Sequence, residues 1–466
     1  MSAGCAELHA PLAARASRAG LSLGSLYLRL LTVLLAGYAL AGKGFAYLGL
    51  GPVYLGEIAL ALGLAIVLAS GAWRRVPRSP ALVLLLAFMA LGFVRTLPGV
   101  VEHGADALRD AVLWAYGLFA VVVACLLTSR PRRLAWLLAR YARFVKLFLL
   151  AAPVLLLLQA SLGDALPRVP GSDVGVVQLK ESDVLTQLAG VAGSQLLGLA
   201  ATPWWSLPVL LASVGALSVY SRGAMLAFCA ALGFLAAMRP LRRRLWVAVL
   251  ALLIAVPVLS VADTGMIVKG REVSTRQILD NWASVFAHGS SYALGGTTAW
   301  RLRWWSKIVD DTARGPYFWT GRGFGLNLAT AHGFDVDARR SLRSPHNGHL
   351  TVLARMGVPG ALLWASLQLA WLGEMLAAYR RSRSGSRWPR LFLLLTACWV
   401  AHLVNASFDV YLEGPMGGIW FWTIFGVGLA AARIQRRQPA ALEPVRAVPA
   451  LRMESGRSPV RSSRST

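Results

Sequence analysis

Residues 73–98 read WRRVPRSPALVLLLAFMALGFVRTLP, a short basic stretch followed by a long apolar run. A helix that spans the hydrocarbon core of a bilayer needs about 20 predominantly apolar residues, and residues 80–98 come close to this length. Similar runs recur along the chain of 466 residues, of which 56% are hydrophobic and only 15% charged. This composition excludes a soluble globular protein and predicts an all-α polytopic membrane protein.

The apolar runs predict about 12 transmembrane helices. They lie at residues 24–41, 53–72, 80–98, 107–127, 140–162, 184–201, 204–220, 223–238, 244–262, 357–378, 390–406 and 415–433. We therefore divide the chain into five segments. These are a cytoplasmic N-terminus (1–23), transmembrane helices one to nine (24–262), a periplasmic loop capped by short helices that carries the catalytic motifs (263–356), helices ten to twelve (357–433) and a disordered basic cytoplasmic tail (434–466).

Arginine-rich loops set the expected orientation, because short loops rich in Lys and Arg stay on the cytoplasmic side. Four such loops follow even-numbered runs, at residues 73–78, 130–133, 239–244 and 380–383. Both termini are therefore expected in the cytoplasm, and the loops after odd-numbered runs face outside. The net charge of +26 comes mainly from these loops and the tail. The tail could touch anionic membrane lipid, but no motif indicates a nucleic-acid partner. The first run reads as an uncleaved anchor.

Three polar residues at distant positions share the outer face in this topology. Arg222 lies between two apolar runs, Arg301 lies in the one long polar loop (263–345), and His346 lies where an apolar helix begins. Two cations and a base at one membrane face suggest chemistry on a lipid-linked phosphate. The simpler alternative for Arg222 is a side chain that reaches the outer headgroups. Ionisable residues at bundle surfaces are often functional, which favours a role for it.

Residues 299–314 predict an amphipathic helix with two distinct faces. At ~100° per residue, the charged face holds Arg303, Lys307, Asp310 and Arg314, and the opposite face holds Trp305, Ile308 and Thr312 together with Arg301. A tryptophan-rich apolar face suits a helix that lies on the lipid interface. Arg303 is expected in solvent. Arg301 points inward and needs a partner, either a carboxylate or a bound phosphate, and the residues alone leave both open.

His346 is the best candidate for a base. Ser344 suits the N-cap and Pro345 the first helical position, so His346 is expected in the first turn of a short surface helix. The positive end of the helix favours a neutral ring there. Such a ring can accept a proton, and the free amides of the turn can bind phosphate. The alternative is a polar interfacial histidine. His349, one turn on, is expected to be structural.

Metal ligands and cofactor motifs are missing from the sequence. The first outer loop, residues 42–47, contains no carboxylate, the long loop has no Asp-x-Asp pair, and no Cys/His spacing suits a metal. Residues 320–325 (TGRGFG) form neither a P-loop nor a dinucleotide fingerprint, and their glycines predict a tight turn that lets the backbone approach a ligand closely. We expect no metal and no cofactor, with arginines neutralising the charge of the phosphate instead.

These stretches together resemble the O-antigen ligase and polymerase superfamily of bacterial inner-membrane proteins. The matching segments are residues 221–224 (SRGA), Trp300-Arg301 with Trp304, residues 321–325 (GRGFG), residues 345–350 (PHNGHL) leading to 357–360 (GVPG), and residues 405–409 (NASFD). The resemblance covers roughly residues 200–430. Each motif is weak alone, but the set in this order on one membrane face is fairly specific.

The resemblance implies transfer of a glycan from undecaprenyl pyrophosphate to an acceptor on the periplasmic face of the inner membrane. It implies that Arg222 and Arg301 bind the donor pyrophosphate and that His346 assists the acceptor hydroxyl. Further substrate-binding candidates are Asn347, Gly321 and Gly323. Pyrophosphate is a good leaving group, so alignment and charge stabilisation are the main needs. No carboxylate nucleophile is evident, and direct displacement would invert the anomeric carbon.

Several functions remain open within and outside this superfamily. A ligase that uses a lipid A–core acceptor is preferred, because one outer loop of moderate size carries both the arginine and the histidine motifs. An O-antigen or exopolysaccharide polymerase and a protein O-oligosaccharyltransferase are the alternatives. A lipid or glycan transporter would bind with the same arginines. It should place charges along a path through the bundle, where Glu57 and Arg29 are the main candidates.

Overall fold

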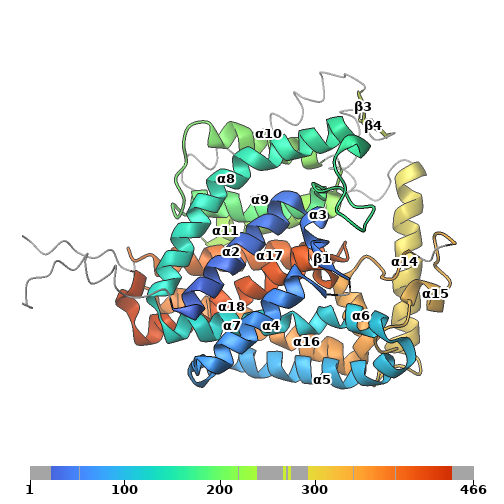
Figure 1. Ribbon diagram of the computed structural model, residues 1–466, viewed down its shortest axis with the longest axis horizontal. Helices are drawn as coiled ribbons and strands as arrows, with labels where there is room; N and C mark the ends of the chain where they lie inside the picture. The colour runs from blue at the N-terminus through green and yellow to red at the C-terminus, as the bar shows by residue number, and fades with distance from the viewer. Residues whose placement is uncertain are drawn as a thin grey trace, which may run out of the picture.

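The computed structural model describes residues 22–238, 266–268, 271–273 and 292–442, apart from positions 52, 219, 339, 340 and 384. Most of these residues form helices that lie alongside one another in a bundle (Figure 1). The strands form two short antiparallel pairs, β1 (Gly49–Leu50) with β2 (Val53–Tyr54) and β3 (Met266–Val268) with β4 (Arg271–Val273). The helical fold class is confirmed for this part of the chain.

The helices divide into an N-terminal and a C-terminal group. The first group comprises α2 (Leu23–Ala41), α3 (Lys43–Ala46), α4 (Leu55–Ala69), α5 (Pro80–His103), α6 (Ala105–Ala115), α7 (Gly117–Ser129), α8 (Arg132–Leu162), α9 (Glu181–Leu196), α10 (Ser206–Ser218) and α11 (Arg222–Met238). The second comprises α14 (Tyr292–Thr312), α15 (Leu328–His332), α16 (Gly348–Arg381), α17 (Trp388–Ala406) and α18 (Pro415–Arg437). Short 3-10 helices are η1 (Ala72–Arg75), η2 (Gly163–Ala165), η3 (Tyr411–Glu413) and η4 (Pro439–Leu442).

Six helices are long and apolar enough to cross a membrane, namely α2, α5, α8, α16, α17 and α18. The pair α6 and α7, bent by 43°, adds a seventh candidate if it is one span. The apolar helices α4, α10 and α11 are shorter than a typical span. The protein is therefore a multi-pass membrane protein with six to seven candidate spans among the described residues, fewer than the expected number of about 12. The run expected at 244–262 lies outside the described residues.

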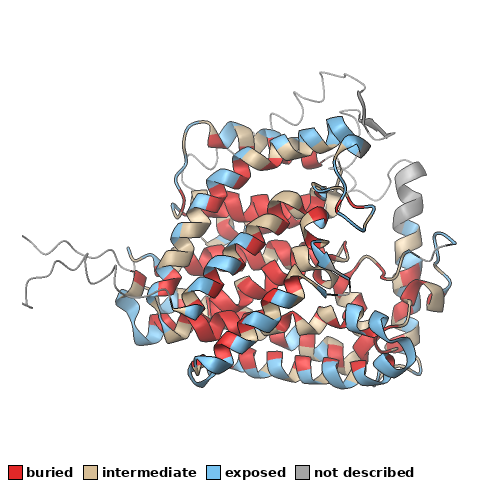
Figure 2. Ribbon diagram, viewed as in Figure 1, coloured by how far each residue is buried: buried red, intermediate tan, exposed pale blue. Residues whose placement is uncertain are grey.

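The centre of the bundle is held by close contact between helix backbones. Gly426 of α18 lies against α7, where an added Cβ would be only 2.4 Å from the carbonyl oxygen of Ala120. Small residues allow such close approach, which matters in a membrane because apolar side chains gain little by leaving lipid. Figure 2 shows the inner helices α9, α17 and α18 largely buried, while α5 and α8 expose residues at the outside of the bundle.

Residues in or next to the four basic loops lie close together at one end of the bundle. Arg75 donates to the Ser129 carbonyl (2.8 Å), and the Tyr379 hydroxyl donates to the Met238 carbonyl (3.4 Å). The last turns of α18 contact both groups. The helices α14 and α15 lie at the opposite end (Figure 1). This arrangement agrees with an orientation in which the basic loops share one side of the membrane.

Helix α16 begins directly after the histidine motif and contains a kink. Gly357 has a left-handed φ of 67° inside the helix. An added Cβ there would be 2.4 Å from the Phe318 carbonyl oxygen, so only glycine fits. The expected break at 357–360 is therefore confirmed. The short helix before it and the span after it form one kinked element.

Candidate functional site

The turn between α17 and η3, residues 407–410, is the point where the candidate residues meet. Its central residue, Asp409, is buried and accepts hydrogen bonds from Lys180 Nζ, from Ser182 Oγ (2.9 Å) and from the Val410 amide (2.8 Å). Burial alone would raise the pKa of Asp409, but the donors around it hold that pKa well below its usual range. The turn therefore presents a fixed negative charge.

His346 lies beside this carboxylate. Its Nδ1 is 3.9 Å from Asp409 Oδ1, and about a third of its side chain (31%) is exposed. This separation is too long for a direct hydrogen bond. Among the described residues other than glycine, only His346 has a positive φ, of 54°. Backbone strain of this kind often accompanies functional sites.

The predicted placement of His346 in a helical turn is wrong. Helix α16 starts at Gly348, and its N-cap is Asn347, whose side-chain oxygen accepts from the amides of His349 and Leu350 (both 3.1 Å). Ser344 is not the cap, because the helix begins only at Gly348; its hydroxyl donates to Glu413 (2.7 Å). His346 therefore precedes the helix and does not lie in its first turn.

Arg301 reaches the same turn from α14. The arginine is half-buried, and its Nη1 donates to the carbonyl oxygen of Phe408 (3.1 Å), next to Asp409. Burial lowers the pKa of Arg301, and the nearby negative charge of Asp409 partly opposes this effect. Arg303 is exposed, so the predicted assignment of the two arginines to opposite faces is confirmed. Within the described part of the chain, Arg301 thus has a backbone carbonyl as its hydrogen-bond partner rather than a directly paired carboxylate.

Arg222 begins α11 next to the same turn. A Cβ added to Gly223 would lie 2.5 Å from Cβ of Phe408, so the backbone of α11 touches the residue whose carbonyl holds Arg301. Glycine is required at this contact because no larger residue leaves room. The segments that carry Arg222, Arg301 and His346, far apart in sequence, therefore converge on residues 407–410. Their roles with a substrate remain predictions.

Tryptophans of α14 fix its position over the site. Trp305 donates from Nε1 to the carbonyl oxygen of Pro345 (2.8 Å), which joins α14 to the residue before His346. Trp304 is fully buried and donates to His332 Nδ1 (3.2 Å), and the other ring nitrogen of His332 contacts Asp311 (3.2 Å). The apolar face of α14 is thus packed against protein, and its expected placement on lipid is wrong for this face.

The carboxylate of Asp311 ends this chain of contacts. It also binds Arg322 of the glycine-rich loop. Burial would raise the pKa of Asp311, but its hydrogen bonds with Arg322 and His332 lower it overall. Asp311 therefore holds α14 to the glycine-rich loop at residues 320–325.

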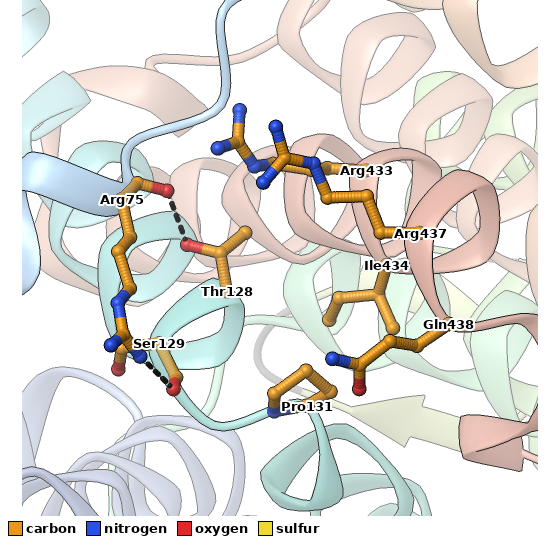
Figure 3. A pocket seen from close by; sticks show the side chains of 8 residues that line it. All are labelled: Arg75, Thr128, Ser129, Pro131, Arg433, Ile434, Arg437 and Gln438. Carbon is orange, nitrogen blue, oxygen red and sulfur yellow. Dashed lines mark hydrogen bonds between the residues drawn. The ribbon is translucent and has the colours of Figure 1, made fainter.

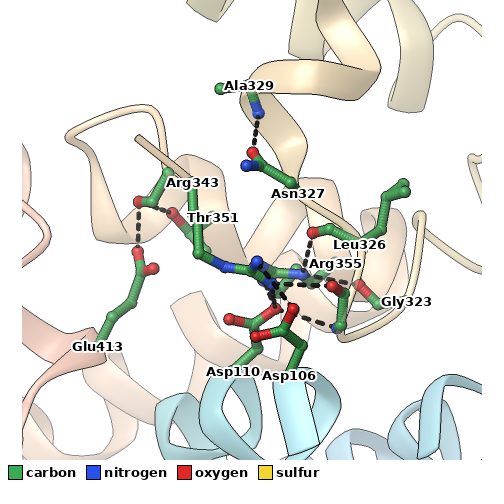
Figure 4. Close-up of polar contacts among 12 residues, drawn as sticks. Asp106, Asp110, Gly323, Leu326, Asn327, Ala329, Arg343, Thr351, Arg355 and Glu413 are labelled. Carbon is green, nitrogen blue, oxygen red and sulfur yellow. Dashed lines mark hydrogen bonds and ion pairs between the residues drawn. The ribbon is translucent and has the colours of Figure 1, made fainter. Parts of the chain in front are cut away.

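A buried ionic network holds the loop that precedes His346 in place (Figure 4). Asp110 Oδ2 is 2.8 Å from Arg355 Nη2 and accepts from Arg343 Nη2 (3.2 Å) and from the Gly325 amide (3.0 Å). Arg343 also pairs with Asp106 (3.2 Å). The side chains of Arg355 and Asp110 are only 1% and 8% exposed, so removing either would leave an uncompensated charge. The network fastens α6 and α16 to the loop that precedes His346.

Glu413 fastens the other side of the same segment. Ser344 Oγ donates to Glu413 Oε1 (2.7 Å) and contacts Thr351 Oγ1 (3.3 Å). Burial raises the pKa of Glu413, and this effect exceeds the opposing influence of the Arg355 charge. The residue just before Pro345 and His346 is therefore anchored to η3, which follows the Asp409 turn.

The glycine-rich loop approaches the protein's own backbone. Gly321 and Gly323 have φ values of 60° and 75°. The Gly323 amide donates to the carbonyl oxygen of Arg355 (3.1 Å), and a Cβ on Gly321 would lie 2.4 Å from the carbonyl carbon of that residue. The predicted tight turn is confirmed. Its close approach is to α16, and contact with a substrate stays a prediction for both glycines, as it does for Asn347.

His349 has a structural environment, as expected. Its Nδ1 accepts from Trp364 Nε1 (3.0 Å), so its Nε2 carries the proton and donates to the Leu403 carbonyl (3.1 Å). Both ring nitrogens are occupied within the protein. In the described part of the chain no group of three or more His, Cys, Asp or Glu side chains is placed to hold a metal ion.

Two further residues of the site escaped the sequence reasoning. Lys180 and Ser182 lie at the start of α9 and contact Asp409. The available signal was a polar cluster, residues 180–183 (KESD), directly before the apolar run at 184–201. Asp409 itself was noted only for the family resemblance of its segment.

The fold and the site define a class of multi-pass helical membrane protein in which arginine, histidine and aspartate meet at the end of the bundle. Residues 207–365 match the family model described as O-antigen ligase, and this part of the chain is an O-antigen ligase family domain. The match includes Arg222, Arg301 and His346 and ends before Asp409. Members of this family are lipid-linked glycan transferases. No curated protein matches the chain.

Proposed function

We propose that this protein transfers a glycan from undecaprenyl pyrophosphate to the lipid A–core of lipopolysaccharide, at the periplasmic face of the bacterial inner membrane. The observation that carries the proposal is the convergence of the segments bearing Arg222, Arg301 and His346 on the turn at 407–410. Cations beside an imidazole suit a reaction in which a phosphate leaves and a hydroxyl attacks.

The two arginines hold the donor in this proposal. Arg301 is half-buried, and its one recorded hydrogen bond among the described residues occupies one of five N–H donors, which leaves others for phosphate oxygens. Arg222 supplies a second cation from α11. As the bond between the anomeric carbon and the phosphate oxygen breaks, negative charge grows on the pyrophosphate. Fixed cations stabilise that charge without reorganisation, so no metal is needed for this step.

His346 receives the proton of the acceptor. Its Nδ1 faces Asp409, so Nε2 is the nitrogen available to the attacking hydroxyl. The acceptor oxygen bonds to the anomeric carbon as the pyrophosphate departs, the proton passes to Nε2, and the anomeric configuration inverts. The Asp409 carboxylate then stabilises the imidazolium. Contacts of this kind are often long before substrates bind.

A transporter is a weaker proposal, because the intramembrane charges it would use have structural contacts. Glu57 accepts from the Tyr116 hydroxyl (2.6 Å) and from the Tyr54 amide (3.0 Å), which caps α4. Arg29 is exposed and lies over the Trp136 ring at 6.0 Å.

An assay with separate acceptors tests the proposal. Purified protein is incubated with undecaprenyl-pyrophosphate-linked glycan and, in parallel, with lipid A–core, with a second lipid-linked repeat unit, or with an acceptor protein. Transfer to lipid A–core supports the ligase. Transfer only to the lipid-linked unit or only to protein replaces it with a polymerase or a protein O-oligosaccharyltransferase. Donor binding without any product would contradict the enzyme proposal itself.

A further inference from the structure

A cavity lined largely by polar residues lies at the end of the bundle opposite the candidate site (Figure 3). Its volume is about 250 Å³, and it lies among η1, the C-terminal end of α7 and the last turns of α18. The residues that line it include Arg75, Thr128, Arg433, Arg437 and Gln438. Nothing in the proposed transfer reaction uses this cavity.

The cavity concentrates positive charge. Arg433 and Arg437 project their guanidinium groups side by side, and Arg75 lies across from them (Figure 3). Arg78, Arg436 and Arg437 are close enough to repel the charge of Arg433. No ion pair to Arg433 or Arg437 occurs within the described residues. Like charges held together without a counter-charge favour the binding of an anion.

Arg75 is fixed in place by the surrounding backbone. Its Nη1 donates to the Ser129 carbonyl (2.8 Å), and its own carbonyl accepts from the Thr128 hydroxyl (2.8 Å). This wall of the cavity is therefore organised before any ligand arrives. Arginines at the end of α18 also complement the helix dipole. That effect accounts for cations at a helix end, but it does not require them to face a cavity together with a third arginine from η1.

The position of the cavity indicates the source of the anion. Helices α7 and α18 both belong to candidate membrane spans, and the cavity lies where they end. Under the expected orientation this level is that of the cytoplasmic headgroups. Basic pockets between transmembrane helices on this side suit anionic lipid headgroups, and guanidinium groups match phosphate oxygens in geometry.

We propose that the cavity among Arg75, Arg433 and Arg437 binds the phosphate of an anionic phospholipid from the cytoplasmic leaflet. The guanidinium groups of Arg433 and Arg437 contact the phosphate oxygens, and the acyl chains extend along the outside of the bundle. The site is independent of the glycan transfer proposed above.

Native mass spectrometry of the full-length protein tests this site, with phosphatidylglycerol or phosphatidylcholine added in detergent. The wild type should retain phosphatidylglycerol at least about tenfold more tightly than phosphatidylcholine, because the arginines of the cavity repel the choline cation of the second lipid. The double variant Arg433→Gln/Arg437→Gln should lose this preference. The control, Arg132→Gln/Arg436→Gln, removes two exposed charges that do not line the cavity, and it should keep the preference.

Three results would overturn the site. Unchanged phosphatidylglycerol binding by Arg433→Gln/Arg437→Gln would show that the cavity does not hold the lipid. An equal loss of the preference in the control double variant would show that the preference depends on the overall charge of the protein and not on the cavity. Displacement of the lipid by millimolar inorganic phosphate, with comparable affinity, would assign the cavity to a soluble phosphate. Melting temperatures of both double variants in phosphatidylcholine, if equal to wild type, exclude unfolding as the cause.

Discussion

His346 Nδ1 lies 3.9 Å from Asp409 Oδ1, although the two residues belong to segments separated by the whole of α16 and α17. The carboxylate is held in place by Lys180 and Ser182, and the histidine backbone is held in a left-handed conformation. An imidazole aligned by a buried carboxylate is a common arrangement for proton transfer.

Asp409→Asn should reduce glycan transfer by at least about tenfold, because loss of the charge removes more than about 1.4 kcal/mol of stabilisation from an imidazolium. The lowered pKa of Asp409 keeps the wild-type carboxylate ionised at all pH values above its usual range. Transfer rates of the two proteins are compared at about pH 7, where the wild-type carboxylate is ionised. Equal rates would show that the charge of Asp409 does not assist the transfer.

Arg301→Ala should reduce transfer by about 10²-fold or more, the scale of one lost charge-stabilising donor. Arg303→Ala is the matched control on the exposed face of the same helix, and its rate should stay near that of wild type. Arg301→Lys should remain impaired, since an ammonium group retains the charge but not the planar fork. Equal losses for the alanine variants at equal protein levels would refute the assignment.

Asp110→Asn should destabilise the protein by about 3 kcal/mol or more, because the buried cation of Arg355 and the partly buried cation of Arg343 lose their common partner. Thermal unfolding in detergent measures the effect. Asp106→Asn is the control, since Asp106 is exposed and, among the described residues, forms an ion pair with Arg343 alone. A similar melting temperature for the two variants would contradict the importance of the buried network.

Glu413→Gln should become more stable relative to the wild type as the pH rises, because the folded state raises the pKa of Glu413. A raised folded-state pKa means that Glu413 stabilises the fold most below its unfolded pKa of about 4.3. This contribution falls as pH rises through the folded pKa. Glutamine still accepts from Ser344 and does not titrate. Its melting temperature relative to wild type should therefore rise between pH 4.5 and pH 7, about the range set by that shift; a constant difference would argue against the raised pKa.

Removal of divalent metal should leave transfer intact, because arginines neutralise the departing pyrophosphate in the proposed reaction. The measurement compares transfer rates with and without excess EDTA. Inhibition by EDTA that is reversed by magnesium or manganese would require a metal in the reaction and would replace the arginine mechanism.

Features that depend on a single segment could be predicted from the sequence, whereas contacts between distant segments could not. The helical period correctly separated Arg301 from Arg303, and GVPG at 357–360 marked the kink in α16. The N-cap prediction failed because α16 begins at Gly348 with Asn347 as its cap, while Ser344 donates to Glu413, a partner distant in sequence. The contact of Lys180 with Asp409 could not be predicted for the same reason, since it depends on packing between α9 and the end of α17.

The central claim is that Arg222 and Arg301 act on one pyrophosphate, and a double-mutant cycle on glycan transfer tests it most directly. The rates of wild type, Arg222→Gln, Arg301→Gln and the double variant are measured with the same lipid-linked donor. Residues that act as a unit are strongly non-additive. Each single variant should lose about 10²-fold or more, and the double variant should lose little beyond the larger single effect. Losses that multiply would contradict a shared pyrophosphate, because they would place the two arginines at independent sites.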